Sequence, residues 1–434
     1  MNPLTKAAAL AALLAAALAA CSGGGKNVPA SSAGAIAAVA PQRGSSDVAY
    51  GADLLTDAQY LGPATLDSLG VDVFVTMRDA AGLVNYAAQV SDPLSPLYRQ
   101  WLRPEELGDR FGAIKDDYDA TAAALRSFGI ATKTYPQRQM IRARGPQPAL
   151  ERALGTTFAY YRKGDVVFVA PATAPHPSAA VHIAALGALA GYSANQRAFV
   201  PVRAGNALVQ GLTPRQIANV FDFTGAWNAG YTGRGINVGI IATGPITDGD
   251  PRIAIGDVAD FKVLYGLGGS GAIRQVFGTD ANVSPGNGSP GGSYSTGLAT
   301  PPPVTNINCK GTLPACNPED IEAQLDTEQA STLAPDANVL FYIAYNPNEC
   351  NSRTPCGTGG APAAAPAIGI NETDDEIQQA IGDNQADVIS MSFGIGEPQG
   401  KGFNFNANGV GFGPTEFASL VAEGIAVFAS SGDT

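Results

Sequence analysis

The chain has 434 residues and a formal net charge of −12; 45% of its residues are hydrophobic and only 15% are charged. This length predicts two or three domains, and this composition is typical of folded proteins rather than disordered ones. The sequence has no basic stripe, so we expect no nucleic-acid partner. A low charge density with an acidic balance favours work in an acidic environment.

Residues 1–21 are predicted to be a targeting segment that is not part of the fold. Lys6 precedes a run of only Ala and Leu over residues 7–20, which is short for a membrane span. The run ends at Cys21, followed by Ser-Gly-Gly-Gly, and this pattern resembles a lipobox. It predicts an exported lipoprotein, held by acyl chains on Cys21 to the outer membrane or cell surface. An ordinary cleaved signal peptide, which would give a secreted protein, is the alternative.

Two segments follow before the second domain begins. Residues 22–64 are expected to be a linker, and residues 65–190 predict a small α+β domain. Its expected strands are 71–77, 139–144 and 166–170, and its expected helices are a segment through Trp101 and Leu102, residues 116–128 and residues 150–154. Gly129 is the predicted end of one helix. Residues 191–211 are polar and rich in turn-forming residues, so we expect an exposed connector.

Residues 212–434 predict a different architecture. Four buried-strand runs lie at 236–242, 339–344, 388–393 and 425–430, and helical patterns lie between them at 319–333, 374–384 and 413–423. Strands that alternate with helices predict a doubly wound, mainly parallel α/β sheet. Residues 267–318 and 345–372 are rich in Gly, Pro and Asn, so we expect them to be surface loops.

The four remaining cysteines form two close pairs in the second domain, Cys309 with Cys316 and Cys350 with Cys356. In an exported protein this even set favours two disulfides. Three connectivities are possible, and local closure within each pair is preferred because each pair brackets a loop containing Gly or Pro. A zinc site is the weaker alternative, since the spacings are not C-x-x-C and no His lies nearby, so no metal ligand is assigned.

Two acidic residues are candidates for proton transfer. Glu322 and Asp326 are four residues apart on a predicted helix and therefore lie on one face. If partly buried, such a pair can share a proton and supply a general base that works in acid; a solvated acidic face is the alternative. The only two histidines, His176 and His182, lie in the first domain. A Ser-His-Asp triad therefore has no base in the second domain.

Further candidates follow the ends of predicted strands, where ligands of open α/β sheets bind. The segment containing Ser392 and Gly394 could pair its backbone with an extended peptide. Asp433, when protonated, could donate a hydrogen bond to a developing oxyanion. An ordinary turn and a helix N-cap are the respective alternatives.

Motifs in both domains resemble those of one peptidase family. Residues 67–190 resemble the pro-kumamolisin activation domain through S-P-L-Y at 95–98, W-L-R-P-E-E at 101–106, R-F-G at 110–112 and A-L-G-T at 153–156. Residues 212–434 resemble the start of a sedolisin catalytic domain, which has a subtilisin-like fold. The matching motifs are L-T-P at 212–214, G-Y-T-G-R-G at 230–235, E-A-Q-L-D at 322–326, L-A-P-D-A at 333–337, S-M-S-F-G at 390–394 and S-G-D at 431–433.

The resemblance implies a monomeric zymogen of a serine-carboxyl endopeptidase that acts on proteins or peptides. It implies Glu322 as the general base, Asp326 as the residue that orients it, Asp433 as an oxyanion donor, and Ser392 with Gly394 as contacts of the substrate backbone. In that family the nucleophile lies in an S-G-T-S motif and calcium binds near the C-terminus. No S-G-T-S occurs in these residues, and the calcium ligands are also absent. The expectation is therefore an incomplete sheet in a C-terminally truncated, inactive chain.

A second hypothesis is a surface lipoprotein without catalytic activity, whose propeptide-like domain binds or inhibits peptidases. Retention of Glu322, Asp326 and Asp433 favours the peptidase, because a binding protein has no need for all three. The missing nucleophile favours the binding protein.

Overall fold

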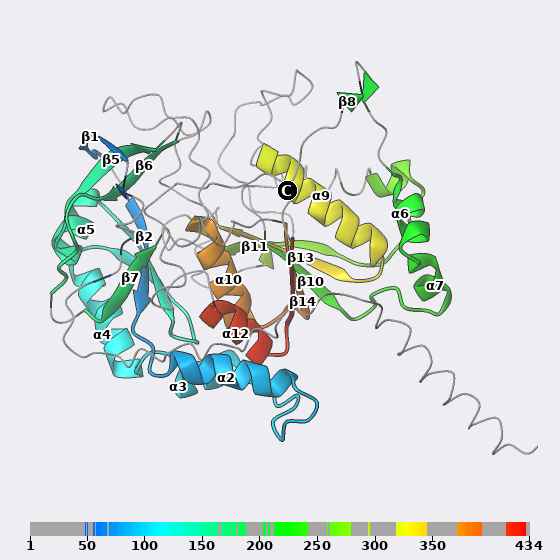
Figure 1. The fold of residues 1–434 in the computed structure, drawn as a ribbon, viewed down its shortest axis with the longest axis horizontal. Helices are drawn as coiled ribbons and strands as arrows, with labels where there is room; N and C mark the ends of the chain where they lie inside the picture. Colours follow the sequence, from blue (N-terminus) through cyan, green and yellow to red (C-terminus); the bar gives the residue numbers. More distant parts are fainter. Residues whose placement is uncertain are drawn as a thin grey trace, which may run out of the picture. The chain divides into compact units, whose positions relative to one another are not determined.

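The computed structural model describes residues 55–187 with short gaps, then 212–241, 261–278, 318–344, 371–392 and 414–430. It also describes residues 48, 50 and 258 and short pieces at 203–204, 207–208 and 294–295. All of these belong to the unit Ser45–Thr434. Within them the fold is mixed α/β, with small antiparallel sheets first and a mainly parallel sheet later (Figure 1).

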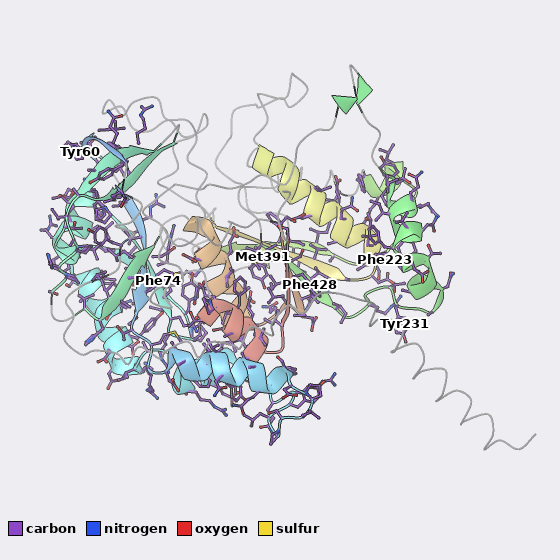
Figure 2. The ribbon with its side chains drawn as sticks, in the orientation of Figure 1. Tyr60, Phe74, Phe223, Tyr231, Met391 and Phe428 are labelled. Carbon is purple, nitrogen blue, oxygen red and sulfur yellow. The ribbon has the colours of Figure 1, made fainter. Side chains whose placement is uncertain are left out.

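A four-stranded antiparallel sheet forms the centre of the first part, in the order β3-β4-β2-β7. Its strands are β2 (Leu69–Val75), β3 (Ala131–Thr134), β4 (Met140–Gly145) and β7 (Ile183–Gly187). Every residue of β2 is buried, because α4 (Lys115–Ser127) packs on one face and a cluster that includes Phe74, labelled in Figure 2, covers the other. The expected strands 71–77 and 139–144 are confirmed within two residues.

A second antiparallel sheet has the order β1-β5-β6, formed by β1 (Gln59–Pro63), β5 (Phe158–Lys163) and β6 (Val166–Pro171). The short helix α5 (Gln147–Leu154) precedes it and ends at Gly155, which has φ +63°. A Cβ at Gly155 would lie 2.1 Å from the His176 carbonyl oxygen, so only glycine fits at this turn. The expected strand 166–170 and the expected helix at 150–154 are both confirmed.

The other helices of this part differ from expectation at two places. The helix α3 (Pro104–Arg110) starts at Pro104, so the helix expected through Trp101 and Leu102 is wrong. Proline has a fixed φ that suits the first helical position, and it holds the preceding residue extended; Arg103 has φ −87° and ψ 159°. The helix α2 (Ala80–Ser91) was not expected; its N-cap, Asp79, accepts a hydrogen bond from the Gly82 amide at 2.8 Å. The helix at 116–128 and its stop at Gly129 (φ +81°) are confirmed.

The later sheet has six strands in the order β12-β11-β13-β10-β14-β15. They are β10 (Asn237–Ile241), β11 (Ile273–Gly278), β12 (Tyr294–Ser295), β13 (Asn338–Ala344), β14 (Val388–Met391) and β15 (Ala426–Ala429). All neighbours are parallel except β11 and β12. The four expected strands are confirmed, and the strand order reverses at β10, which pairs with β13 on one side and β14 on the other.

The strand β11 corrects the expectation that residues 267–318 form only surface loops. It lies between β12 and β13, and Val276 is fully buried. Its sequence, Ile-Arg-Gln-Val-Phe-Gly, places two polar residues in a short run and so resembles a loop. Most of the other expected loop, 345–372, lies outside the described residues.

Helices cover both faces of the parallel sheet (Figure 1). The helices α10 (Asn371–Asp383) and α12 (Pro414–Ala422) pack on the face that includes Ile241. The helix α9 (Pro318–Leu333) covers the opposite face, where Ala330 packs against the cluster that includes Ile240. Burial on both faces explains the continuous apolar strand sequences. Two short helices, α6 (Pro214–Val220) and α7 (Phe223–Asn228), precede β10. Among the described residues, no helix has the length and hydropathy that a membrane span requires.

Candidate functional site

Two of the residues singled out in the sequence meet at the carboxyl end of β14. Asp326 lies in the middle of α9, and Ser392 directly follows Met391, the last residue of the strand, which is labelled in Figure 2. The Ser392 hydroxyl donates a hydrogen bond to Asp326 Oδ1 at 2.7 Å, joining residues 66 positions apart. The predicted helix and the predicted strand end therefore form one site.

The environment of Asp326 favours its neutral form. Burial raises the pKa of this carboxyl to about 6, although the hydrogen bond from Ser392 acts in the opposite direction. Its second oxygen, Oδ2, is buried and has no hydrogen-bond partner among the described residues. Below about pH 6 Asp326 is therefore protonated and can act as a hydrogen-bond donor.

The direction of α9 places Glu322 relative to this contact. The helix ends just before β13, while Asp326 meets the carboxyl end of the parallel strand β14. Glu322 is one turn earlier, so its backbone lies farther toward the carboxyl edge of the sheet, on the same helix face as Asp326. The Glu322 side chain, Gly394 and Asp433 lie outside the described residues, and their roles stay predictions.

The remaining predicted ligands and cross-links are not tested by the structure. Cys21, Cys309, Cys316, Cys350 and Cys356 all lie outside the described residues, as does the end of the chain after Ser430. Within the part that the structure describes, no group of three His, Cys, Asp or Glu side chains could hold a metal ion. The calcium that the family resemblance implies therefore stays an expectation.

Two of the quoted motifs have a structural role away from this site. Asp336, in L-A-P-D-A, accepts hydrogen bonds from the Thr232 hydroxyl at 2.6 Å and from the Ser270 amide and hydroxyl at 2.9 and 2.8 Å. These donors hold the pKa of Asp336 well below its usual range. Because Asp336 precedes β13, this cluster fixes the loops at the amino edge of the sheet, opposite the Asp326 site.

A second contact of interest lies where the first part of the chain meets α10 and α12. One half of this contact is apolar: residues of α2 and its following loop, including Leu83, Tyr86 and Leu102, form one cluster with Ala418 and Ala422 of α12. The Leu102 amide also donates to the Ala422 carbonyl oxygen at 2.9 Å.

The other half is a buried polar cluster of three side-chain amides with one carboxyl and one hydroxyl, called the amide cluster: Gln137, Gln139, Gln378, Glu416 and Ser419. Gln137 Nε2 donates to the carbonyl oxygen and Oε1 of Gln378 at 2.8 and 2.7 Å. Gln378 Nε2 donates to Gln139 Oε1 at 3.1 Å and Glu416 Oε1 at 3.0 Å. Gln139 Nε2 donates to the Ser419 hydroxyl at 2.8 Å. Buried amides are costly unless paired, so these bonds select one way of packing.

The comparison with protein families decides what this first part is. Residues 58–184 match the model described as the pro-kumamolisin activation domain. The first part of the chain is thus similar to this domain, and residues 58–184 are called the activation domain below. The match agrees with the resemblance carried by the motifs between 95 and 156. A search of the curated proteins found no match to the chain.

The activation domain also brings charged side chains to α10. Lys133 Nζ lies 3.5 Å from Asp375 Oδ1, and the Tyr135 hydroxyl donates to the same carboxylate. Burial lowers the pKa of Lys133 and raises the pKa of Asp375. Sequence reasoning missed this contact because the polar run at 371–379 is also the pattern of a solvent-facing helix; its acidic triplet at 374–376 is in fact buried.

Glu423, just after α12, is the least compensated carboxyl of this contact. Its neighbours in sequence, Ala422 and Gly424, both touch the activation domain. Both Glu423 oxygens are buried and have no hydrogen-bond partner among the described residues. Burial, helped by the nearby carboxylates of Asp383 and Glu105, raises the pKa of Glu423 to about 10. The docked state therefore holds a proton at this position.

Proposed function

We propose that the chain is the zymogen of an exported serine-carboxyl endopeptidase that hydrolyses peptide bonds of proteins at acidic pH. The observation that carries the proposal is the match of residues 58–184 to an activation domain. It is supported by the mainly parallel sheet that follows, where the carboxyl end of β14 brings Ser392 to Asp326. We assign residues 212–434 to a subtilisin-like, doubly wound catalytic domain. Helices on both faces of the sheet and the strand reversal at β10 support this assignment.

In the proposed mechanism Glu322 is the general base that accepts the proton of a serine nucleophile. Asp326, protonated in acid, donates a hydrogen bond that orients Glu322 and favours its ionised form. Its raised pKa of about 6 supports this role. Asp433 donates to the oxyanion, and the backbone of Ser392 and Gly394 pairs with the extended substrate. No serine among these 434 residues is assigned as the nucleophile.

Control of the activity follows from the proposed domain order. The activation domain, docked on α10 and α12, keeps the enzyme inactive until the connector at 191–211 is cut. The buried contacts of Lys133, Gln137 and Gln139 support a specific docking. We further propose a lipid anchor on Cys21 and two disulfides among Cys309, Cys316, Cys350 and Cys356, with export as the reason for both.

The test is cleavage of a denatured protein between pH 3 and 7 by the purified product of the complete gene, because the proposal assigns no nucleophile within these 434 residues. Glu322→Gln should lower the rate by about 100-fold or more, since loss of a general base typically costs that much. Glu328→Gln, on the same helix, is the matched control and should leave the rate unchanged. Equal rates for the wild type and Glu322→Gln would overturn the assignment of the base.

A further inference from the structure

The hydrogen bond from Ser392 gives the two carboxyl oxygens of Asp326 different roles. Oδ1 accepts the Ser392 hydroxyl at 2.7 Å, whereas Oδ2 is buried and unpartnered among the described residues. Because Oδ1 is already an acceptor, the proton of the neutral acid belongs on Oδ2. The hydroxyl thus decides which oxygen can donate.

Among the described residues, the elements packed around α9 supply no other group that could hold this carboxyl by charge. The strands β10, β13 and β14 carry no charged side chain, and α6 carries one, Arg215. The Arg215 guanidinium donates to the Gly266 carbonyl oxygen at 3.0 Å. On α9 itself the nearest carboxylates in sequence are Glu322 and Glu328. A neutral donor from the strand end is therefore the anchor of Asp326 among the described residues.

We propose that Ser392 is a positioning residue, which fixes the rotation of the Asp326 carboxyl and reserves Oδ2 for donation to a second carboxyl of the site. This inference rests on the proposed function, because that proposal supplies the second carboxyl. The contact between Ser392 and Asp326 does not depend on peptide cleavage. It gives the Ser392 side chain a task distinct from the backbone contact with substrate. The hydroxyl acts through Asp326 and does not touch the reacting atoms.

The proposal is tested by titrating Asp326 in the 434-residue chain. The chain is labelled with ¹³C at the aspartate carboxyl groups, and the Asp326 signal is assigned as the one missing in Asp326→Asn. The variants are Ser392→Ala, which removes the hydroxyl, Ser392→Thr, which keeps it, and Ser390→Ala, a matched control two residues earlier on β14. Circular dichroism verifies that each variant is folded.

The expected wild-type pKa of Asp326 is about 6. Ser392→Ala should raise the proton affinity of Asp326 about tenfold, since a hydrogen bond to a charged group is worth about 1.5–3 kcal/mol and a tenfold change about 1.4 kcal/mol. Ser392→Thr and Ser390→Ala should leave the affinity at its wild-type value. A titration of Asp326 that Ser392→Ala does not change overturns the proposal, and so does a shift of equal size in Ser390→Ala.

The outcome is separable from that of the proposed function. If the chain is not a peptidase, the cleavage assay fails while the Asp326 titration still responds to Ser392→Ala. If Ser392 has no positioning role, Glu322→Gln still abolishes cleavage while the titration is unchanged. If Ser392→Ala is unfolded, the comparison of Ser392→Thr with Ser392→Cys replaces it, because only the hydroxyl is a strong donor.

Discussion

Gly424 lies at the contact between α12 and the activation domain, and it offers the sharpest test of that contact. Its φ of +89° is in the left-handed region, and a Cβ at this position would lie 2.9–3.1 Å from three ring atoms of Trp101. Gly424→Ala therefore meets two separate costs. The left-handed backbone costs about 1–2 kcal/mol for a residue with a side chain, and forcing the Trp101 ring away adds about 1–3 kcal/mol.

Gly230→Ala separates the two costs. Gly230 has φ +87°, and a Cβ there would meet nothing within 4 Å. We expect Gly230→Ala to lower the free energy of unfolding by about 1–2 kcal/mol, and Gly424→Ala to lower it by about 2–5 kcal/mol. Adding Trp101→Leu to Gly424→Ala should reduce the combined cost below the sum of the two single losses, because the obstructing ring is gone.

The assay is urea unfolding followed by tryptophan fluorescence. The chain has two tryptophans, so a Trp227→Phe background leaves Trp101 as the fluorescent reporter in the glycine variants. The Trp101→Leu variants, which have no tryptophan in that background, are compared with the others by circular dichroism. Equal losses in Gly424→Ala and Gly230→Ala would show that Trp101 does not pack on Gly424 in solution. Strict additivity of Trp101→Leu and Gly424→Ala would lead to the same conclusion.

Three further predictions concern buried polar groups, each measured by thermal or urea unfolding. Asp72→Asn should lower the free energy of unfolding by about 3–5 kcal/mol, because the buried Arg142, 2.7 Å away, loses its counter-charge. A free energy of unfolding within about 1 kcal/mol of wild type would contradict this. Gln378→Leu should lower the free energy of unfolding by about 1–3 kcal/mol for each amide that it leaves unpaired in the amide cluster. Gln385→Leu, at an exposed position, should hardly change it. For Glu423 the pKa in the docked state is raised from 4.5 to about 10, so its contribution is fully present below about pH 4.5 and is lost as the pH rises toward 10. Glu423→Gln should flatten that slope, and an unchanged slope would refute the assignment.

Much of the secondary structure follows from local patterns. The strands β10, β13, β14 and β15 are apolar runs because helices bury both sheet faces, and α4 is recognisable from its 3.6-residue period and Gly129. The errors have local causes too. Pro104 moves a helix start past Trp101, and the polar residues Arg274 and Gln275 hide the strand character of β11.

The candidate site was predictable only in part. The spacing of Glu322 and Asp326 places them on one helix face, and the end of β14 is a place where sheets bind ligands. The contact of Asp326 with Ser392 joins residues 66 positions apart, so it depends on tertiary packing that no local pattern encodes. The amide cluster was missed for the same reason: Gln378 is a polar helix residue, and its buried amide bonds to Gln137 and Gln139, which are far away in the sequence.

The most direct test of the zymogen proposal is acid-induced self-processing of the purified gene product, followed by sequencing of the new N-terminus. At about pH 4 we expect cleavage within the connector at 191–211 and the appearance of peptidase activity. Glu322→Gln should remain intact under the same conditions. Processing of Glu322→Gln at the wild-type rate, or full activity of the uncut precursor, would contradict the proposal.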